Sequence, residues 1–573
     1  MKSSFFAVIM LLVIWITAGA QNGTSTHHPE RILIKFVPES PVFTEIQAYQ
    51  MKSSPRLDEK ITSEEEGRYP VAASFMNAHD LASLRPLVRS SRNNKALRTG
   101  SSARDRMYIG LVNNPDQLYS VIEQLRSHPE IKYAEPDHIG YGSGKRSPNG
   151  NEMPVPDQQS RAFGTLADAF PNDRLFGFQW GLENTGQSIG DINGTAGEDI
   201  NIKTAWDITT GSSDITVAIL DSGQPDTVPD FGDRVVPGYN FVSDTTSTKD
   251  DLGHGTNVAS IALATGNNDG TIAGVDWNAM IMPIKILNEN DFGLYSWWVD
   301  GIYWAIDNGA DILNMSVGGS NPNSFLEQAV SDAIDSGVHV IASMMNTNND
   351  VAFIPASYEG VVSVGAINNQ GVRAEPFCWG GGSNYGDHID LVAPGERIVG
   401  LSYTNPEAGT FWCGTSQATP MVTGVVSLML SIDPGLTPAE VKQILTETSR
   451  GNENWNQYTG WGVLDAHAAV SYVVEMQQTG ITAELPLMME LEQNYPNPFN
   501  PATLISYHIP EQMHVTLSVY TADGRRVGVL VDEMRAAGRH SVQFDASGLS
   551  SGVYLYEMIS GRQRTTRQMT LVK

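Results

Sequence analysis

The sequence predicts an α/β protein with a large central domain built on a doubly wound, mostly parallel sheet. A small α/β module precedes this domain, and a small all-β sandwich follows it. Three observations lead to this fold class. Short apolar runs without strict alternation recur between residues 170 and 475, as in strands buried on both faces. Stretches with helical spacing separate these runs. The last eighty or so residues instead alternate apolar and polar side chains between turns.

The first twenty residues have the features of a cleavable export signal. Lys2 gives a positive start, residues 5–17 are almost wholly apolar, and Ala18-Gly19-Ala20 supplies small residues, which a signal peptidase accepts. About thirteen apolar residues are too few for a membrane anchor, which needs roughly twenty. We therefore expect residues 1–20 to be removed. No later stretch is long and apolar enough to cross a bilayer, so we expect no membrane span in the mature form.

The net charge of −28 is concentrated in one part of the chain. Residues 170–475 hold 37 of the 64 acidic residues but only 9 of the 36 basic ones. A surface this acidic repels nucleic acid and anionic lipid, so the sequence predicts no nucleic-acid partner. It would favour calcium and cationic substrates. Acidity that only keeps an exported protein in solution explains the charge about as well.

Residues 21–141 form the predicted α/β module, and residues 142–169 form a predicted linker because Gly, Ser, Pro and Asn occur throughout. Residues 85–106 are rich in Arg, Ser and Asn with little apolar content, which predicts an exposed loop. The elements expected in the module are two strands, residues 31–36 and 131–136, and a short helix, residues 121–126.

Residues 170–475 form the predicted doubly wound domain, in which strands alternate with helices. Its expected strands are residues 215–220, 281–286, 312–315 and 338–342. Its expected helices are residues 257–264, 296–308, 324–336 and 419–430.

A linker, residues 476–490, separates this domain from the predicted sandwich, residues 491–573. Near its start the sandwich has three prolines in six residues, 496–501, which could not lie inside a helix or a central strand. The expected strands are residues 514–520, 541–544 and 553–558, with turns at Asp523-Gly524 and Ser551-Gly552.

Three segments of the central domain place a reactive side chain at the end of a strand or helix. Asp221 ends a buried strand, His254 leads into a helix within Gly-His-Gly-Thr, and Ser416 opens a long apolar helix. Each is weak evidence alone, because a strand-end Asp is commonly a turn residue and a Ser before a helix is commonly an N-cap. Together they supply a nucleophile, a base that takes its proton and a carboxylate that fixes the base.

Residues 170–470 resemble the subtilisin-like serine proteases throughout. The segments that carry the resemblance, beside the three above, are residues 178–182 (FQWGL), 205–211 (AWDITTG), 295–297 (YSW) with Gly301-Ile302, and 391–395 (LVAPG). The resemblance implies a secreted endopeptidase that acts on protein or peptide substrates. The rival interpretation is a catalytically weak surface-binding protein that kept the fold.

The resemblance also implies the role of each residue. Asp221 would orient His254, which would act as general base and then acid for attack by Ser416. Asn346 falls where the family has its oxyanion-hole asparagine. The substrate backbone would lie as an added strand between an edge containing Ser316 and Gly318 and an opposite edge containing Gly293 and Tyr295.

The sequence departs from the family at four positions. Met345 stands where glycine usually precedes the oxyanion asparagine, so Met344 and Met345 should narrow the primary specificity pocket or shift the local backbone. Asn257 stands where His is usual, Gln417 replaces the usual Met after the nucleophile, and Met421 replaces a usual His. None of these changes removes a catalytic group, but Met345 puts the geometry of the oxyanion hole in question.

Calcium is the expected structural ion, and no catalytic cofactor is expected. Asp173, Asp230 and Asn268 resemble ligands of the family's strong calcium site, and carboxylate, amide and loop carbonyl oxygens form the cage this ion needs. A solvated acidic turn is the alternative. Cys378 and Cys413 either pair, as an oxidising destination favours, or remain two buried thiols.

The flanking modules also resemble known parts. Residues 28–138 are similar to the subtilisin propeptide, most clearly at residues 133–137 (YAEPD), so the domain's own propeptide is an expected partner. Residues 491–573 resemble the C-terminal sorting domain of type IX secretion cargo, on residues 494–501 (NYPNPFNP) and 551–554 (SGVY). This implies the type IX machinery as a partner and secretion, with retention at the cell surface left open. A plain adhesive or carbohydrate-binding sandwich is the alternative.

Overall fold

The computed structural model describes residues 26–52, 69–88, 103–148, 170–479 and 490–572, except position 191, residues 452–454 and short gaps at 492, 495–496, 510–512, 523, 536–537 and 561–562. The expected signal, residues 1–20, and most of the predicted loop 85–106 lie outside the described residues. By its internal contacts the chain divides into two units, Met1–Tyr472 and Val473–Lys573.

An antiparallel sheet in the order β4-β1-β3-β2 forms the N-terminal module. Its strands are β1 (His27–Phe36), β2 (Leu81–Pro86), β3 (Met107–Val112) and β4 (Ile131–Gly142). Its helices are α2 (Pro41–Lys52), α4 (Pro70–Ala78) and α5 (Leu118–Arg126), with 3-10 turns at Ala103–Arg106 and Pro115–Gln117. The helices bury one face of the sheet around Phe36, Phe75 and Leu125.

The prediction of an exposed loop over residues 85–106 is wrong at both of its described ends. β2 pairs with β3 up to Pro86, and Leu87 is completely buried. At the other end, Ala103–Arg106 form a 3-10 turn. The ladder to β3 and the packing of Leu87 are tertiary contacts, so they override what local composition favours.

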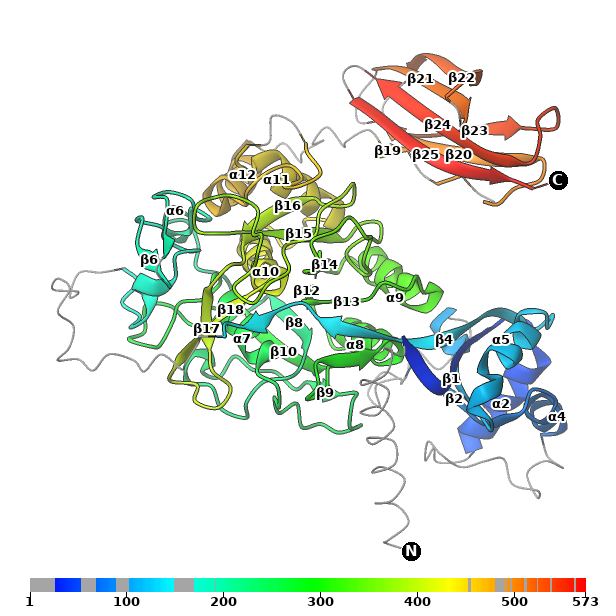
Figure 1. Ribbon diagram of the computed structural model, residues 1–573, viewed down its shortest axis with the longest axis horizontal. Helices are drawn as coiled ribbons and strands as arrows, with labels where there is room; N and C mark the ends of the chain where they lie inside the picture. The colour runs from blue at the N-terminus through cyan, green and yellow to red at the C-terminus, as the bar shows by residue number, and fades with distance from the viewer. Residues whose placement is uncertain are drawn as a thin grey trace, which may run out of the picture. The chain divides into compact units, whose positions relative to one another are not determined.

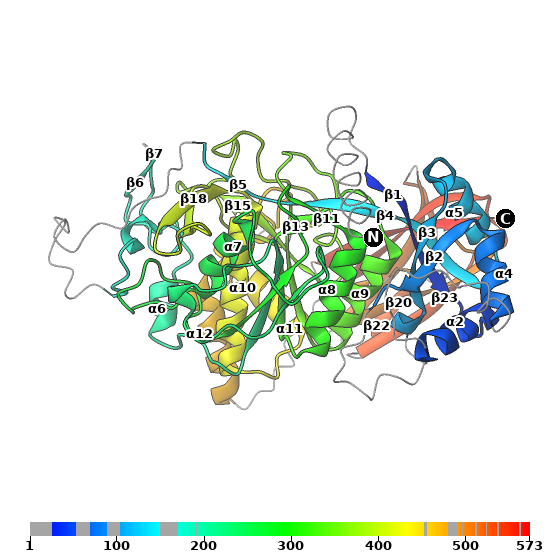
Figure 2. The same cartoon turned by 90° about the horizontal axis from the view of Figure 1, so that it is seen from below.

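The other face of the module's sheet packs on two helices of the central domain, α8 (Tyr295–Asp307) and α9 (Ser324–Asp335). Leu33 and Ile109 of the module share one apolar cluster with Tyr303 of α8. The Glu135 carboxylate accepts hydrogen bonds from the Ser324 N–H at 3.0 Å and from the Asn323 side chain at 2.8 Å, at the N-terminus of α9, where a negative charge is favourable. Figures 1 and 2 both show the module beside these helices.

A seven-stranded parallel sheet, ordered β16-β15-β14-β12-β8-β10-β9, is the centre of the main domain. Its strands are β8 (Thr216–Asp221), β9 (Tyr239–Asn240), β10 (Met280–Lys285), β12 (Ile312–Met315), β14 (His339–Ser343), β15 (Val362–Ile367) and β16 (Leu391–Pro394). The remaining helices are α6 (Ile202–Trp206), α7 (His254–Leu263), α10 (Thr415–Ile432), α11 (Pro438–Thr448) and α12 (Ala466–Thr479), with 3-10 turns at Phe176–Phe178 and Pro229–Phe231. The predicted doubly wound sheet is confirmed, with α8 and α9 on one side and α7 and α10 on the other (Figure 2).

Helix α10 begins four residues earlier than predicted and contains Pro420. Proline has no N–H and leaves the carbonyl four residues earlier without its helical partner. That carbonyl belongs to Ser416, and the Ser316 hydroxyl donates to it at 3.1 Å. The side chain of a neighbouring strand therefore satisfies the carbonyl that the proline leaves open.

Short strands frame the surface at the carboxyl edge of the sheet. They are β5 (Lys145–Arg146), β6 (Ser188–Ile189), β7 (Ile192–Asn193), β11 (Phe292–Leu294), β13 (Val317–Gly318), β17 (Ile398–Leu401) and β18 (Gly409–Cys413). β4 continues six residues past its predicted end and pairs antiparallel with both β11 and β13, and β5 pairs with β18. The start of the predicted linker 142–169 is therefore strand, because the edges of β13 and β18 supply hydrogen bonds that composition does not reveal.

The C-terminal unit is the predicted β-sandwich. One sheet is β19-β20-β23 and the other β22-β21-β24-β25. The strands are β19 (Glu490–Leu491), β20 (Ala502–Ile509), β21 (Met513–Thr521), β22 (Arg526–Arg535), β23 (Gly538–Asp545), β24 (Gly552–Ser560) and β25 (Gln563–Leu571). Phe499, Tyr507, Leu517 and Tyr556 are among the buried residues of its core.

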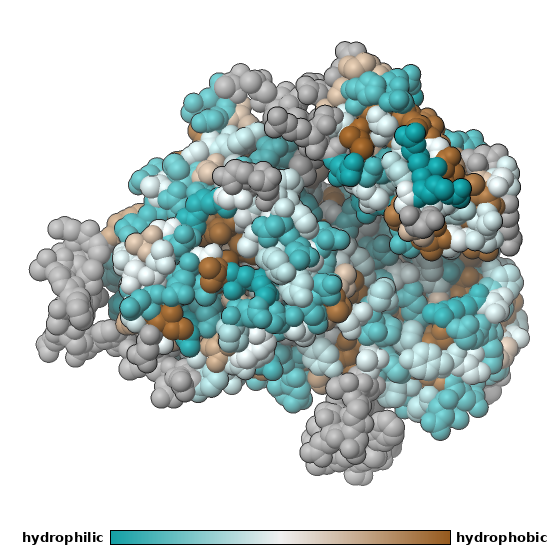
Figure 3. Space-filling model, turned by 45° about the horizontal axis from the view of Figure 1, so that its top comes forward, coloured by the Kyte–Doolittle hydropathy of each residue, from teal (hydrophilic) through white to brown (hydrophobic). Residues whose placement is uncertain are grey.

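Hydrophilic side chains predominate on the face shown in Figure 3, with small brown groups scattered among them. Among the described residues, every helix is too short or too polar to cross a membrane.

Candidate active site

The three predicted reactive residues lie together at the carboxyl edge of the parallel sheet. Asp221 is the last residue of β8, His254 is the first of α7, and Ser416 is the second of α10. All three are fully buried in the structure. The carboxyl ends of parallel strands and the starts of the following helices meet at one edge of such a sheet, which is why residues far apart in sequence converge here.

His254 and Asp221 form the closest pair. Nδ1 of His254 lies 2.7 Å from Oδ1 of Asp221. Burial disfavours a charged imidazole, but the adjacent Asp221 carboxylate outweighs it and raises the pKa of His254 to about 9. The Asp221 oxygen also accepts the Ser222 N–H at 2.7 Å, which holds the carboxylate in place.

Asp250, which sequence reasoning missed, organises the turn before His254. Its carboxylate accepts the N–H groups of Gly253 and Thr256 at 2.8 and 3.0 Å, and the Ser222 hydroxyl at 2.8 Å. The Asp-Leu-Gly-His-Gly-Thr pattern could have suggested it, because a carboxylate just before a helix commonly caps it. Gly255 must be glycine, since a Cβ there would lie 2.9 Å from the backbone nitrogen of Gly223.

The Ser416 hydroxyl faces the chain that enters the cleft. Its Oγ lies 2.5 Å from Oγ of Ser143 and 3.1 Å from the carbonyl oxygen of Ser316. Nε2 of His254 is buried and makes no hydrogen bond to any described residue. In this arrangement the nucleophile and the base are neighbours, but their hydrogen bond is not formed.

The carbonyl oxygen of Ser143 occupies an oxyanion hole. It accepts the Asn346 side-chain amide and, at 3.2 Å, the backbone N–H of Ser416. Asn346 is itself oriented, because its Oδ1 accepts the Thr415 N–H at 2.9 Å and the Thr415 hydroxyl at 3.0 Å. These are the two donors that the resemblance implied, and Met345 does not prevent them from converging.

Met345 has a left-handed backbone, with φ of 70°, a conformation that favours glycine. Its side chain lies across Gly318, where an added Cβ would come within 2.6 Å of the Met345 sulfur. Met345 is 7% exposed. The thioether therefore occupies space beside Ser143 that a glycine would leave open.

The predicted substrate edges hold residues 139–142 between them. Gly293 of β11 pairs with Gly140, and Gly318 of β13 pairs with Tyr141. The Ser316 carbonyl accepts the Ser143 N–H at 3.1 Å. Tyr295 is buried below this strand and packs against Gly319, where its ring leaves no room for a Cβ.

Two of the departures from the family pattern are partners. The Gln417 amide donates to Oδ1 of Asn257 at 3.1 Å, and both residues are fully buried. Each residue alone would bury a polar group at a cost of roughly 1–3 kcal/mol. Met421 is also buried, and its methyl group lies under Gly181.

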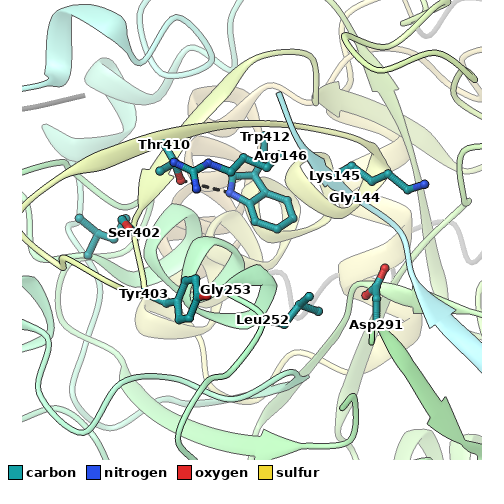
Figure 4. Close-up of a pocket in the computed structure, with 11 residues that line it drawn as sticks. Gly144, Lys145, Arg146, Leu252, Gly253, Asp291, Ser402, Tyr403, Thr410 and Trp412 are labelled. Carbon is teal, nitrogen blue, oxygen red and sulfur yellow. Dashed lines mark hydrogen bonds between the residues drawn. The ribbon is translucent and has the colours of Figure 1, made fainter. Parts of the chain in front are cut away.

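Beyond Ser143 the chain continues along a cavity of about 360 Å³, shown in Figure 4. Lys145 pairs with Cys413 of β18, and its ammonium lies 4.9 Å from the centre of the Trp379 ring. Trp412 donates its indole N–H to Thr410 at 3.1 Å, so its ring forms a fixed wall of this cavity. The Asp291 side chain stands at the opposite side of the same space.

Cys378 and Cys413 form a disulfide, with Cα atoms 6.1 Å apart. It ties β18 to the loop that carries Trp379. The two sulfurs and Glu396 are close together, but sulfurs bonded to each other are not thiolate ligands. Burial raises the pKa of Glu396 to about 7.

The residues predicted to bind calcium converge on one loop. Asp173 and Asp230 are both buried, and a Cβ at Gly270 would overlap the side-chain oxygens of both Asp230 and Asn268. Oδ1 of Asp173 is buried without a hydrogen bond. Burial, together with the charge of Asp230, raises the pKa of Asp173 to about 6. Buried, unpartnered carboxylate oxygen of this kind fits a divalent cation.

A nucleophile, base and carboxylate at the edge of a doubly wound sheet, with an adjacent oxyanion hole, are typical of subtilisin-type serine proteases. Comparison with known proteins agrees. Residues 212–462 match the model of the subtilase family, and residues 493–572 match that of the secretion system C-terminal sorting domain.

The thermophilic serine proteinase of Bacillus sp. (strain AK1) is 33% identical over 354 residues, covering 62% of this chain and 76% of that protein. Thermitase of Thermoactinomyces vulgaris is 34% identical over 268 residues, covering 47% of this chain and 92% of that protein. The chain belongs to the subtilase family and is a subtilisin-like serine endopeptidase.

The crystal structure of fervidolysin from Fervidobacterium pennivorans, described as a keratinolytic enzyme related to subtilisin, superposes with a TM-score of 0.57 at 21% identity. It covers 94% of this chain and 71% of that chain. At this identity the likeness concerns the fold alone.

Proposed function

We propose that this protease acts outside the cell and hydrolyses peptide bonds of extracellular proteins through Asp221, His254 and Ser416. The Ser416 hydroxyl turns to His254, gives up its proton and attacks the carbonyl carbon. Asn346 and the Ser416 N–H stabilise the resulting oxyanion, a contribution of roughly 3–4 kcal/mol for such a donor. His254 then gives the proton to the leaving amine, and water releases the acyl group from Ser416 by the same route.

The observation that carries this proposal is the position of the Ser143 carbonyl. Its oxygen accepts hydrogen bonds from both oxyanion donors, and Ser416 Oγ lies beside it. The flanking residues pair with β13 and β18 on either side. A peptide bound in this way presents the bond between Ser143 and Gly144 to the nucleophile.

The N-terminal module is therefore proposed to act as a propeptide, and the bond after Ser143 as the first bond that the protease cuts. Attack by Ser416 would break the C–N bond to Gly144 and release a new amino terminus at Gly144. This narrows the expected cleavage region, residues 138–170, to one bond.

Labelling with a fluorophosphonate probe tests the activity. We expect the probe to label Ser416 in the processed protein and not in Ser416→Ala. The same variant, purified alone, should stay joined to its N-terminal module, whereas the wild type should yield a fragment beginning at Gly144. Full processing of purified Ser416→Ala would contradict self-cleavage. Absence of labelling of the wild type would favour the catalytically weak binding protein, for which the unformed bond between Ser416 and His254 is the supporting observation.

Calcium is proposed to bind Asp173, Asp230 and Asn268. The support is the buried, unpartnered oxygen of Asp173 and the convergence of these side chains around Gly270. The ion would neutralise two buried carboxylates and so stabilise the folded domain.

Export is proposed to use the signal segment 1–20 and then the type IX secretion machinery, which would recognise the C-terminal sandwich. The match of residues 493–572 to a secretion sorting domain supports this route. Secretion, with retention at the cell surface, follows from it. Removal of residues 491–573 should leave the protease inside the outer membrane in a host with that machinery.

A further inference from the structure

The chain that enters the cleft has glycine at every second position. Gly140, Gly142 and Gly144 alternate with Tyr141 and Ser143. Successive side chains of an extended strand point to opposite faces. Tyr141 is 42% exposed, so the positions of Gly140 and Gly142 face the enzyme.

The side chain of Trp298 fills the space under Gly140. A Cβ at Gly140 would come within 2.6 Å of Cζ2 of the indole and closer still to its neighbour. Trp298 is completely buried, and its ring lies 5.1 Å from that of Tyr295. A side chain so enclosed cannot turn aside without disturbing helix α8.

Asp291 fills the space under Gly142 in the same way. A Cβ at Gly142 would overlap its carboxylate and lie 3.2 Å from Cγ. On the far side of the bond, a Cβ at Gly144 would lie 2.7 Å from Oε1 of Gln417 and 3.0 Å from Cβ of Ser416. Each of these contacts is closer than real Cβ atoms tolerate.

Met345 limits the remaining position, that of Ser143. Its thioether lies against Gly318 beside the pocket, and the Ser143 hydroxyl is 2.5 Å from the Ser343 hydroxyl and 3.1 Å from the Ser316 carbonyl. A small hydroxyl side chain fits these partners. A non-glycine residue in a left-handed conformation is strained, and such strain persists where the side chain has a use.

We propose that the cleft selects extended, glycine-rich protein segments. The preferred substrate has glycine at the second and fourth residues before the cut, a small residue such as serine directly before it, and glycine directly after it. Trp298, Asp291 and Met345 are the residues that impose this choice. The inference rests on the proposed proteolytic function and names its substrate class.

Quenched fluorescent peptides with the sequence of residues 138–147 test it on the processed wild-type protein. Replacing the residue that corresponds to Gly140 or Gly142 by leucine, or Ser143 by phenylalanine, should lower kcat/KM at least about tenfold, as a misfit of one or more methylenes does. Replacing Tyr141 by alanine is the matched control and should change little, because that side chain faces solvent. Equal cleavage of the leucine, phenylalanine and parent peptides would overturn the proposal.

Enlarged-pocket variants identify the residues responsible. Met345→Gly should restore cleavage of the phenylalanine peptide but not of the Gly140-to-leucine peptide, and Trp298→Leu should do the reverse. Each variant is thus the control for the other, and its melting temperature reports folding. If Trp298→Leu does not fold, the peptide series on the wild type still decides.

Two further outcomes separate this inference from others. A peptide with lysine at the Gly142 position that is cut faster than the parent would make Asp291 the anionic wall of a cationic subsite, and would overturn the glycine preference. A protein that reacts with fluorophosphonate but does not cut the parent peptide would contradict the substrate class alone. A protein that does not react with fluorophosphonate would contradict the proposed function itself.

Discussion

The side-chain oxygen of Asn346 accepts two hydrogen bonds from Thr415, one from its N–H at 2.9 Å and one from its hydroxyl at 3.0 Å. These bonds fix the amide plane of Asn346, so that its NH₂ group points at the carbonyl of Ser143. The residue just before the nucleophile therefore aims the oxyanion donor.

We expect Asn346→Ala to slow self-cleavage after Ser143 by about 10²- to 10³-fold, the usual effect of losing one oxyanion donor. Thr415→Val keeps the backbone bond and loses only the hydroxyl, so the rate should fall by roughly two- to tenfold. The measurement is the first-order rate of appearance of the processed band. Equal rates for Asn346→Ala and wild type would show that Asn346 does not bind the oxyanion.

Self-cleavage should accelerate with rising pH. His254 must be neutral to take the Ser416 proton, and its pKa is about 9 while Ser143 occupies the cleft. The rate should therefore rise about tenfold per pH unit and level off near pH 9. Processing that reaches its full rate near pH 6.5 would contradict the raised pKa.

Asp291→Asn tests the cause, because the Asp291 charge also raises the pKa of His254. We expect the midpoint of the pH profile to move to lower pH. Asp335→Asn, which removes an exposed charge at the end of α9, is the matched control and should leave the midpoint unchanged. The raised pKa of His254 also has a stability consequence. It stabilises the fold below about pH 6.5, and this stabilisation is lost as pH rises through about 9.

Chelation should lower the melting temperature of the processed protein, because a ligand at a hundred times its Kd adds about 2.7 kcal/mol to the free energy of unfolding. Asp230→Ala should abolish the difference between calcium and chelator, whereas Asp214→Ala, at an exposed turn, should not. No effect of chelator on the wild type would contradict the site.

The raised pKa of Asp173 gives the calcium site a pH signature. Without calcium, the folded state prefers the protonated carboxyl, so the stability contributed by Asp173 falls as pH rises towards and through about 6. Asp173→Asn should remove this fall. The comparison is between urea unfolding curves of chelated wild type and variant at several pH values. An identical pH dependence in the two proteins would contradict it.

Loss of the disulfide should destabilise the protein. The bridge spans 35 residues, and the chain-entropy model gives about 3–4 kcal/mol for a loop of this length. We expect Cys378→Ser with Cys413→Ser to lower the free energy of unfolding by this order. Reduction of the wild type should reproduce the effect and leave the double variant unchanged, which separates the bridge from other actions of the reductant.

Local sequence was sufficient to predict the parallel sheet and the positions of Asp221, His254 and Ser416. Buried parallel strands are short and continuously apolar, and the reactive residues follow them directly. The start of α10 was placed too late, because the compensation of Pro420 by the Ser316 hydroxyl is a tertiary contact.

The chain between Ile139 and Arg146 shows where local sequence fails. Its glycines and serines are typical of a linker, and nothing local predicts a strand. The hydrogen bonds come from β11, β13 and β18, which are distant in sequence. The alternation of glycine was nevertheless visible, and it was the one available signal that one side of this segment has no room for side chains. The bond between Gln417 and Asn257 was equally hidden, because each residue alone looked like an isolated departure.

Strand β4 belongs to two sheets at once, since its first half completes the N-terminal module and its second half lies between β11 and β13. Cutting the chain after Ser143 breaks one covalent bond but none of these ladders. The severed module would therefore remain as a plug, tethered by its own fold at high local concentration. The moment at which the protease becomes active would then depend on how long the module stays folded. Mutations in the core around Phe36, far from Ser416, would act as a clock setting.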